Sequence, residues 1–307
     1  MTNAHIVQIC RILDAIAGDT TLHDEDRYVE RTEALDQLEF PILATLIEPS
    51  TIPHADDQRR ALTHRAMILH AELSAINTRL FQHLCTTITL PTTTPDQRLQ
   101  LLRRYISPNS PPFDSGEYDA LDVLVNGILQ LDQHTEPEEA VGDPEMIRYQ
   151  PTPARAILEL IEQMQIRPTD VFYDLGSGLG HVTILVALLT EASAVGIEID
   201  QGLCDVAQHC IRRLALPTAT MVCSDVRAAD LSEGTIFYMY TPFTGTILQA
   251  VLERLRLIAM QHPIRLCTYG PYLAEVALQP WLTPVSAVGA ITVYMSCLLY
   301  TSDAADE

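Results

Sequence analysis

Lysine is absent from this sequence of 307 residues, so its 19 basic residues are all arginines, and 40 acidic residues give a formal net charge of −21. A protein that binds the phosphate backbone of nucleic acid needs clustered lysine and arginine side chains. Here the arginines are scattered and adjoin one another only in pairs such as Arg59–Arg60. The charge therefore argues against a nucleic-acid partner, and its simplest consequence is solubility.

Metal motifs, signal sequences and membrane spans are missing as well. The seven cysteines form no C-x-x-C pair and the ten histidines form no H-E-x-x-H pattern, which argues against a metal site and favours reduced, buried thiols. No apolar run reaches the ~18 residues that a membrane span needs, and no basic-then-apolar signal opens the chain. These absences predict a soluble, cytoplasmic protein with no metal and no membrane partner.

The stretch 171–200 is the most informative part of the sequence. It reads as a short β-favouring segment (Val171–Asp174), a glycine-rich turn (Leu175–Gly180), an apolar helix (His181–Thr190) and a second strand (Ala194–Ile199). Strand, helix and strand in this order predict a right-handed parallel crossover.

Each small residue of the turn has a physical use. Gly176, Gly178 and Gly180 permit positive φ and let a ligand approach the backbone closely. The helix that follows offers free N–H groups and a positive dipole end to an anion. Glu198, near the end of the next strand, is placed to accept hydrogen bonds from ribose hydroxyls.

The glycine spacing separates the two cofactors that fit this outline. The dinucleotide fingerprint G-x-G-x-x-G needs glycine at position 181, where this sequence has His181. The pattern here is D-x-G-x-G-x-G from Asp174 to Gly180, which resembles motif I of the class I S-adenosylmethionine-dependent methyltransferases. That resemblance implies that the turn and the acid hold the methionine part of the cofactor. An NAD-dependent oxidoreductase and a glycine turn that binds nothing are the alternatives.

The resemblance covers residues 145–296 and implies an α/β fold with a Rossmann-like seven-stranded sheet, parallel except for its last strand. Further strands are expected at 218–223, 235–240, 264–269, 284–288 and 290–295. The segments RYQPTP, DLGSGLGHV and GIE are similar to a bacterial branch near the telomeric-silencing histone-lysine methyltransferases. Those enzymes have an asparagine-containing motif where this chain has Tyr240–Phe243. They also use basic segments to reach nucleosomes, and this chain has none. The fold and the cofactor are therefore carried over, and the histone substrate is not.

Cofactor residues follow from the resemblance and from the position of the loop 148–153, which leads into the helix before the first strand and so lies over the crevice. Thr152 is also expected to cap that helix, with Pro153 in its first turn; a plain cap and turn is the alternative for this loop. Gln150 is a further candidate for contact with cofactor or substrate. The residues expected to bind the cofactor are Tyr149, Thr152, Asp174, Gly176, Ser177, Gly178, Gly180, Glu198, Ser224 and Asp225, the last at the family's adenine position.

The acceptor is expected beside the junction Tyr240, Thr241, Pro242 and Phe243, which loosely resembles the S/N/D-P-P-Y/F motif of amino-group methyltransferases. The resemblance implies that Thr241 and the carbonyl held by Pro242 accept hydrogen bonds from the target amine. Phe243 would stack or pack on the acceptor, and Tyr240 would face the sulfonium. The alternative is a strand end at which Thr241 caps the next helix.

The chain is expected to divide into a helical unit at residues 1–140, the cofactor domain at 145–296 and a tail at 297–307. Helices are predicted at 6–16, 28–47 with an interruption at Pro41, 56–85, 96–106 and 118–131, and the leucine stripe of 56–85 is the clearest. An acidic linker, Glu136–Asp143, follows them. The tail CLLYTSDAADE resembles a translated sequencing adapter and is predicted to be non-native, with a natural polar tail as the alternative.

The sequence therefore predicts an S-adenosylmethionine-dependent methyltransferase of unknown acceptor, with a protein side chain or small molecule favoured over nucleic acid. In-line attack on a sulfonium methyl asks the protein mainly to align two groups and exclude water. No carboxylate pair or nucleophile–histidine set is needed for that, and none is found. A non-catalytic protein that binds the same cofactor, as a sensor or partner subunit, is the alternative.

Overall fold

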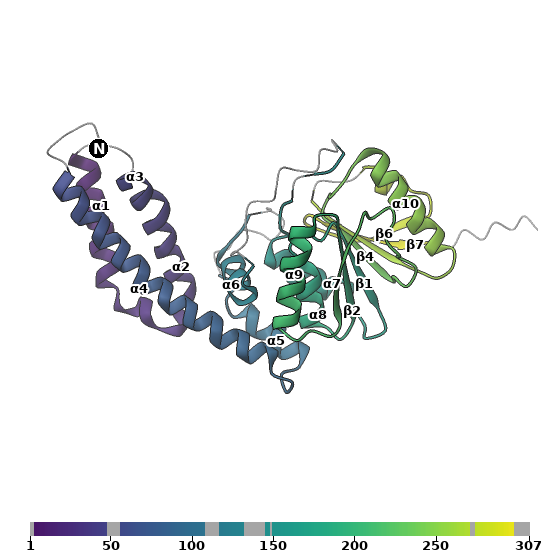
Figure 1. The fold of residues 1–307 in the computed structure, drawn as a ribbon, viewed down its shortest axis with the longest axis horizontal. Helices are drawn as coiled ribbons and strands as arrows, with labels where there is room; N and C mark the ends of the chain where they lie inside the picture. Colours follow the sequence, from purple (N-terminus) through teal and green to yellow (C-terminus); the bar gives the residue numbers. More distant parts are fainter. Residues whose placement is uncertain are drawn as a thin grey trace, which may run out of the picture. The chain divides into compact units, whose positions relative to one another are not determined.

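The computed structural model describes residues 3–47, 56–107, 117–131, 145–147, 149–270 and 274–297. By its contacts the chain divides into two compact units, Met1–Thr87 with Tyr105–Pro108, and Ile88–Arg104 with Asn109–Glu307. Figure 1 labels their elements. The expected linker Glu136–Asp143 lies outside the described residues, and so does the expected tail apart from Cys297.

The first unit is helical. Apolar residues of α1, α2 and the first half of α4 share one core, including Leu13, Ala34 and Leu73. Pro41 lies in a π-helical turn, since a proline removes a backbone donor and widens the local hydrogen-bond pattern. The elements are α1 (Asn3–Gly18), two 3₁₀ turns (Thr20–His23 and Glu25–Arg27), α2 (Tyr28–Gln37), the π turn (Leu38–Leu43), α3 (Ala44–Ile47) and α4 (Asp56–Thr89), whose last residues belong to the second unit.

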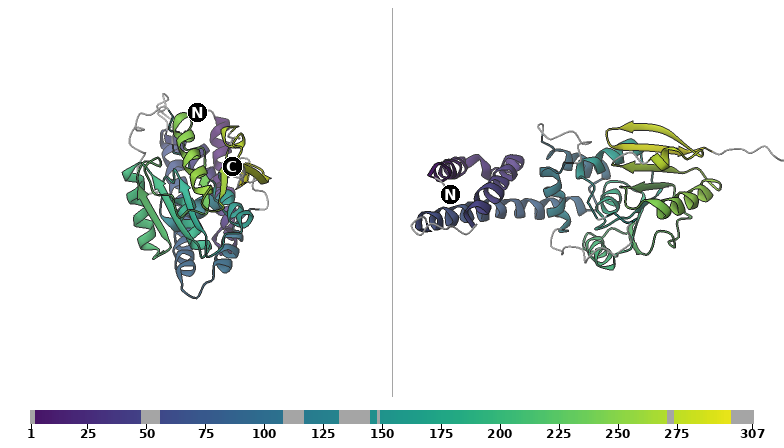
Figure 2. Two further views of the ribbon diagram at one scale, coloured as in Figure 1. Left: turned by 90° about the vertical axis from the view of Figure 1, so that its right-hand side faces the viewer. Right: turned by 90° about the horizontal axis from the view of Figure 1, so that it is seen from above.

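The second unit is built on a seven-stranded sheet with the strand order β3-β2-β1-β4-β5-β7-β6. The first five strands are parallel, β7 is antiparallel to β5, and β6 pairs with β7 as a hairpin, drawn in yellow in Figure 2. This confirms the predicted fold class. The strands are β1 (Val171–Leu175), β2 (Ser193–Glu198), β3 (Ala219–Cys223), β4 (Ile236–Met239), β5 (Arg265–Tyr269), β6 (Leu282–Val288) and β7 (Ile291–Ser296).

Helices cover both faces of the sheet. The α10 helix packs on the face that presents Tyr173, Phe237 and Leu266, while α7, α8 and α9 lie together on the other side (Figure 1). Strand order reverses between β1 and β4, so a crevice opens at the carboxyl ends of these strands. The helices are α5 (Pro95–Arg103), α6 (Ala120–Leu129), α7 (Ala154–Met164), α8 (His181–Leu189), α9 (Gln201–Arg213), α10 (Gly245–Ala259) and α11 (Ala274–Ala277).

Two helices that the sequence analysis placed in the amino-terminal unit belong to the second unit by their contacts. The α5 helix contacts α8, and α6 contacts α7. The domain boundaries at 140 and 145 themselves stay a prediction, because the chain between α6 and residue 145 is not described.

Candidate functional site

A cavity of about 760 Å³ opens at the carboxyl ends of β1, β2 and β4. Its wall brings together residues that lie far apart in the sequence. Two of the expected cofactor residues, Gly178 and Gly180, are not part of the wall. The expected residues that line it are Tyr149, Gln150, Thr152, Asp174, Gly176, Ser177, Glu198, Ser224, Asp225, Tyr240, Thr241, Pro242 and Phe243.

The glycine turn after β1 is shaped by close contacts with two side chains of the site. Gly176 and Gly178 have φ of 83° and 55°. A β-carbon on Gly178 would lie 1.9 Å from the ring of Tyr149, and one on Gly176 would lie 2.3 Å from Pro242. From the sequence, a ligand was expected in this space. In the structure Tyr149 and Pro242 take it, so the glycines are required by packing within the protein.

Glu198 joins the end of β2 to the glycine turn. Its Oε2 accepts a hydrogen bond from the Gly178 N–H at 2.7 Å, and its Oε1 accepts from the N–H groups of Ile199 and Asp200 at 2.8 and 3.0 Å. A carboxylate has about four acceptor positions, so this one retains capacity for a further donor. Ribose binding by Glu198 stays a prediction.

Asp174 is buried at the bottom of the cavity, with 3% of its surface exposed. The hydroxyl of Thr183 donates to its Oδ2 at 3.1 Å, and Ser177 Oγ lies 3.0 Å from the same hydroxyl. Burial raises the pKa of Asp174 to about 7. A cation in the cavity would favour the ionised form of this carboxyl group.

His181, the first residue of α8, is a part of the wall that the sequence analysis did not assign. Its Nδ1 lies 3.2 Å from the hydroxyl of Tyr149, and its Nε2 lies 2.7 Å from Asn126 Oδ1 on α6. Burial lowers the pKa of His181 to about 4, so the ring is neutral at neutral pH. In the sequence His181 counted only as a departure from the dinucleotide fingerprint.

Thr152 does not cap α7, so that expectation is wrong. Its hydroxyl lies 2.8 Å from the hydroxyl of Tyr238, and both side chains are buried in the wall of the cavity. Pro153 is the cap residue and makes no side-chain cap bond. The free N–H of Ala154 donates instead to Asp122 of α6 at 2.7 Å. A buried hydroxyl needs a partner, and Tyr238 supplies it.

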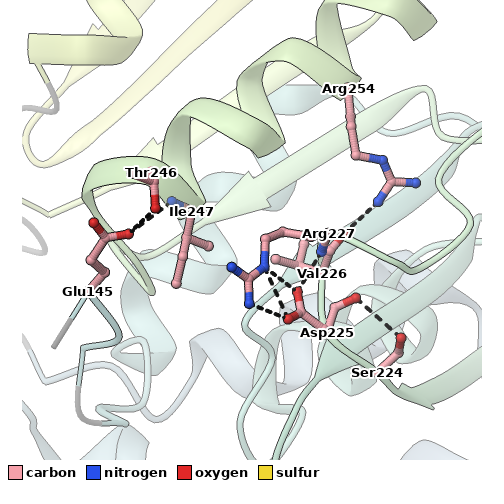
Figure 3. A network of polar contacts seen from close by, with 8 residues as sticks. All are labelled: Glu145, Ser224, Asp225, Val226, Arg227, Thr246, Ile247 and Arg254. Atoms are coloured by element: carbon pink, nitrogen blue, oxygen red, sulfur yellow. Dashed lines mark hydrogen bonds and ion pairs between the residues drawn. The ribbon is translucent and has the colours of Figure 1, made fainter. Parts of the chain in front are cut away.

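At the end of β3, Asp225 forms a fork with Arg227, which Figure 3 shows at its centre. Arg227 Nη2 donates to Oδ2 at 2.6 Å and Nε donates to Oδ1 at 3.0 Å. Hydrogen bonds from Arg227 lower the pKa of Asp225, which keeps the carboxylate ionised. Ser224 lies beside it, and its N–H donates to the Glu198 carbonyl at 2.8 Å. Adenine binding at this end stays a prediction.

The junction after β4 contains a strained residue. Thr241 has φ of 42°, a left-handed conformation that a β-branched residue adopts rarely. Its hydroxyl lies 3.5 Å from the Tyr269 carbonyl. Beside it, the rings of Tyr240 and Tyr269 meet edge to face with centroids 4.8 Å apart. Strain of this kind persists only where the surrounding structure enforces it, as at functional sites.

Segment 145–147 crosses this junction. The Pro242 carbonyl, expected to receive the target amine, accepts a hydrogen bond from the Ile147 N–H at 3.1 Å. Met146 pairs with Phe243 in a single antiparallel bridge. The carboxylate of Glu145 accepts from the Thr246 hydroxyl at 2.7 Å and from the Ile247 N–H at 3.1 Å, at the start of α10 (Figure 3).

Those contacts overturn the alternative that Thr241 caps the next helix. The cap residue of α10 is Thr244, which makes no side-chain cap bond, and Glu145 binds the first turn.

Among the described residues there is no group of three or more histidine, cysteine, aspartate or glutamate side chains that could hold a metal ion. Within the same ranges no helix is long and apolar enough to cross a membrane.

Comparison with known proteins gives a family match over residues 148–221, to the family described as histone methylation protein DOT1. A histone-lysine N-methyltransferase, H3 lysine-79 specific, from Dictyostelium discoideum is 30% identical over 104 residues, which cover 29% of this chain and 6% of that protein. A protein-lysine N-methyltransferase from Saccharolobus islandicus (strain REY15A) is 28% identical over 96 residues, which cover 31% of this chain and 60% of that protein. The chain therefore spans only part of either relative.

Solved structures with a similar arrangement include an RNA methyltransferase from Salinibacter ruber in complex with S-adenosyl-L-homocysteine. It is 27% identical, with a TM-score of 0.38, and the match covers 48% of this chain and 92% of that one. The PH0226 protein from Pyrococcus horikoshii OT3 is 14% identical, with a TM-score of 0.39 and coverage of 51% and 97%. The family match over residues 148–221, the sheet order and the glycine turn bear out the predicted resemblance: the second unit has the seven-stranded fold expected for class I S-adenosylmethionine-dependent methyltransferases, and over that segment it is similar to the DOT1 family.

Proposed function

We propose that this protein transfers the methyl group of S-adenosylmethionine to the side-chain amine of a lysine in another protein. One observation carries the proposal: a single cavity contains both the residues expected to hold the cofactor and the strained junction Tyr240–Phe243. The two relatives, a histone-lysine and a protein-lysine methyltransferase, support a lysine acceptor.

The residues of the cavity fit the cofactor chemically. Asp174 lies buried where an ionised carboxylate would stabilise the cationic amine or sulfonium of the methionine part. Glu198 retains acceptor positions for ribose hydroxyls, and Asp225 is held ionised for the adenine amino group. When bound, the cofactor supplies an electrophilic methyl group. The protein's own residues then need to orient the two reactants and exclude water.

At the other end of the cavity, the junction residues would receive the acceptor. The rings of Tyr240 and Phe243 offer apolar walls to the methylene stem of a lysine and a π face to its cationic head. Thr241 is held in its left-handed conformation with the hydroxyl near the Tyr269 carbonyl. Hydroxyl and carbonyl oxygens can accept hydrogen bonds from a lysine amine and so orient its lone pair.

The charge of the chain gives a reason to expect a basic acceptor segment. With a net charge of −21, the protein attracts cationic peptides and repels phosphate backbones at low salt. This is the ground for preferring a protein over nucleic acid as acceptor.

A second candidate function is a protein that binds the cofactor without catalysis. The contact that favours it is the hydrogen bond from the Ile147 N–H to the Pro242 carbonyl, which uses one of the two lone pairs of an acceptor expected for the target amine. Turnover to S-adenosylhomocysteine distinguishes the two functions, because a sensor binds the cofactor and produces none.

The test uses the absence of lysine from the chain. Untagged protein is incubated with methyl-labelled S-adenosylmethionine and a cell extract, and the products are separated into protein, nucleic-acid and small-molecule fractions. After acid hydrolysis, labelled ε-N-methyllysine in the protein fraction must come from an acceptor, since the protein itself has no lysine. Label in nucleic acid or in small molecules alone would contradict the proposal.

Variants of the junction provide the residue-level control. Thr241→Ala and Phe243→Ala are expected to reduce methyl transfer at least tenfold, about 1.4 kcal/mol of transition-state stabilisation. Cofactor affinity should stay near that of the wild type, because these side chains lie at the acceptor end. Full turnover in both variants would place the acceptor elsewhere.

A further inference from the structure

One face of α6 and the residues before it carry polar side chains spaced four residues apart. Tyr118, Asp122 and Asn126 each bond to a different part of the crevice. The Tyr118 hydroxyl donates to the Pro151 carbonyl at 2.7 Å, Asp122 accepts from the Ala154 N–H at 2.7 Å, and Asn126 Oδ1 lies 2.7 Å from His181 Nε2. Residues at this spacing lie on one side of a helix, so α6 presents a polar edge to the site.

The third of these contacts continues to the cavity wall as a chain of hydrogen bonds. His181 lies between Asn126 and Tyr149, with Nε2 toward the former and Nδ1 toward the latter. The ring of Tyr149 in turn lies against Gly178, inside the glycine turn. The chain thus runs from α6 through the first residue of α8 to the turn.

Donors and acceptors match along this chain in one arrangement. A neutral imidazole has one N–H and one lone pair. Because Asn126 presents a carbonyl oxygen, the proton of His181 lies on Nε2, and Nδ1 accepts from the Tyr149 hydroxyl. Asn126 thereby fixes the tautomer and the ring orientation of His181, as hydrogen-bond partners do for histidines elsewhere in proteins.

The tyrosine is fixed at its ring as well as at its hydroxyl. The ring lies against Gly178, where a β-carbon would approach it to 1.9 Å. The N–H of the same glycine donates to Glu198 at 2.7 Å. Tyr149 therefore contacts the turn that the cofactor must meet, and its position determines the shape of that part of the cavity.

We propose that Asn126 and His181 are positioning residues for cofactor binding, because they hold the Tyr149 ring against Gly178 and keep this wall of the cavity in its binding shape. The inference rests on the proposed function, since it concerns the same cofactor. It assigns α6 to the cofactor site, although α6 does not line the cavity and carries no recognisable motif.

A double-mutant cycle tests the coupling. Asn126→Leu removes the acceptor at nearly constant volume, and Tyr149→Phe removes the hydroxyl while keeping the ring. Binding of S-adenosylhomocysteine, measured by titration calorimetry, should weaken at least fivefold in each variant. In the double variant the losses should not multiply, because both changes break the same chain. KM for S-adenosylmethionine should rise correspondingly, with kcat within twofold of the wild type.

Two further variants separate positioning from general packing. Asn126→Asp keeps an acceptor for the Nε2 proton and should restore affinity to within twofold of the wild type. Val123→Ala lies on the exposed side of the same helix, where 41% of its surface is accessible, and should leave affinity unchanged. Losses that multiply in the double variant, or no rescue by aspartate, would overturn the inference.

Nitrogen NMR of the imidazole provides a readout that does not depend on the cofactor. The wild type should show a neutral His181 with its proton on Nε2, and Asn126→Leu should shift the ring toward a mixture of tautomers. A proton on Nδ1 in the wild type would overturn the inference even if the cofactor binds. The expected tautomer in a wild type that binds no S-adenosylhomocysteine would contradict the proposed function, and the inference with it.

Discussion

Both units bury charged or titratable groups, but they satisfy them differently. In the helical unit, Arg31 is fully buried, and the acceptors of its guanidinium are neutral oxygens: Asn77 Oδ1 at 2.6 Å and the carbonyls of Leu22 and Asp24, both at 2.8 Å. In the second unit, Asp174 and His181 are bonded to side-chain hydroxyls and an amide, and both line a cavity.

The difference separates a structural group from groups suited to bind a ligand. The guanidinium of Arg31 donates hydrogen bonds to backbone carbonyls at the 3₁₀ turns and to Asn77 of α4, and so connects these elements of its own unit. Burial instead raises the pKa of Asp174 and lowers that of His181, so that both groups favour their neutral forms. Because both line the cavity, a bound ligand can offset the free-energy cost of burying them. A buried polar group is thus a candidate for function when it lines a cavity, and has a structural role when its bonds are to backbone carbonyls.

The largest effect should come from removing the structural group. Arg31→Ala leaves a cavity, two carbonyls and the Asn77 amide without their donor, and should cost about 3–5 kcal/mol in the free energy of unfolding. Urea denaturation measures this loss. Affinity for S-adenosylhomocysteine in the folded protein should stay within twofold of the wild type.

The matched control is Arg31→Met, which keeps most of the volume and removes the charge. It should cost less than the alanine variant, because a buried charged group can often be replaced by an apolar one. A loss of cofactor affinity in a folded Arg31 variant would break the distinction between the two interiors.

The second prediction concerns the pH dependence of stability. Asp174 has a folded pKa of about 7 against 3.8 in the unfolded chain, so its stabilisation is present below 3.8 and is lost as the pH rises through 7. His181 has a folded pKa of about 4 against 6.5, so its stabilisation is present above 6.5 and is lost as the pH falls through 4. Between pH 4 and pH 6.5 both groups contribute a slope to the free energy of unfolding. The two slopes, each about 1.4 kcal/mol per pH unit, have opposite signs and nearly cancel.

Single variants should expose each slope. With Asp174→Asn, the unfolding free energy relative to the wild type should increase as the pH rises from 4.5 to 6.5; with His181→Gln it should decrease over the same range. Urea denaturation at three pH values measures both. Burial also raises the pKa of Asp122 to about 6, but that group is common to all the proteins and drops out of the difference. Parallel pH profiles for the wild type and both variants would contradict the assignment.

The parts of the fold that the sequence predicted are those with local signals. Strand, glycine turn and helix at 171–190 follow from residue types that are adjacent in the chain, and the sheet order follows from the family that the turn resembles. The place of Glu198 in the cavity wall could also be predicted, because its distance from the turn is set by one crossover unit, while its contact with ribose stays a prediction.

What the sequence could not predict depends on tertiary partners. Thr152 has the local signature of a helix cap. In the structure its hydroxyl is buried and bonds instead to the hydroxyl of Tyr238, which lies 86 residues away in the sequence. Asn126 and His181 are 55 residues apart in the sequence and meet because α6 packs on α7, which in turn packs on α8. Neither contact produces a periodicity or a motif in the sequence.

The third prediction tests the cofactor side directly. Glu198→Ala should weaken cofactor binding by roughly 1.5–3 kcal/mol if the carboxylate makes a charge-assisted bond to ribose. It also releases the N–H of Gly178, so the turn loses one of its anchors. Glu191→Ala, an exposed acid just before β2, is the control and should bind as the wild type does. Equal affinity of both variants, measured by calorimetry, would remove Glu198 from the site.

The smallest effect concerns the strain at the acceptor end. Thr241 has φ of 42°, and glycine adopts that conformation without the clash of a branched side chain. Thr241→Gly should therefore raise the free energy of unfolding by about 1 kcal/mol. Gln165→Gly is the matched control, because Gln165 has φ of 43° at the exposed end of α7, away from the cavity, and its replacement should also stabilise the protein.

The two glycine variants should differ in methyl transfer. Gln165→Gly should keep the turnover of the wild type, whereas Thr241→Gly should lose at least tenfold, because it removes the hydroxyl and frees the backbone that positions Tyr240 and Pro242. Such a gain in stability with a loss of turnover is expected where strain is maintained for function. If Thr241→Gly instead gains stability and keeps full turnover, the strained conformation is a property of the strand end, and the acceptor is oriented by other residues.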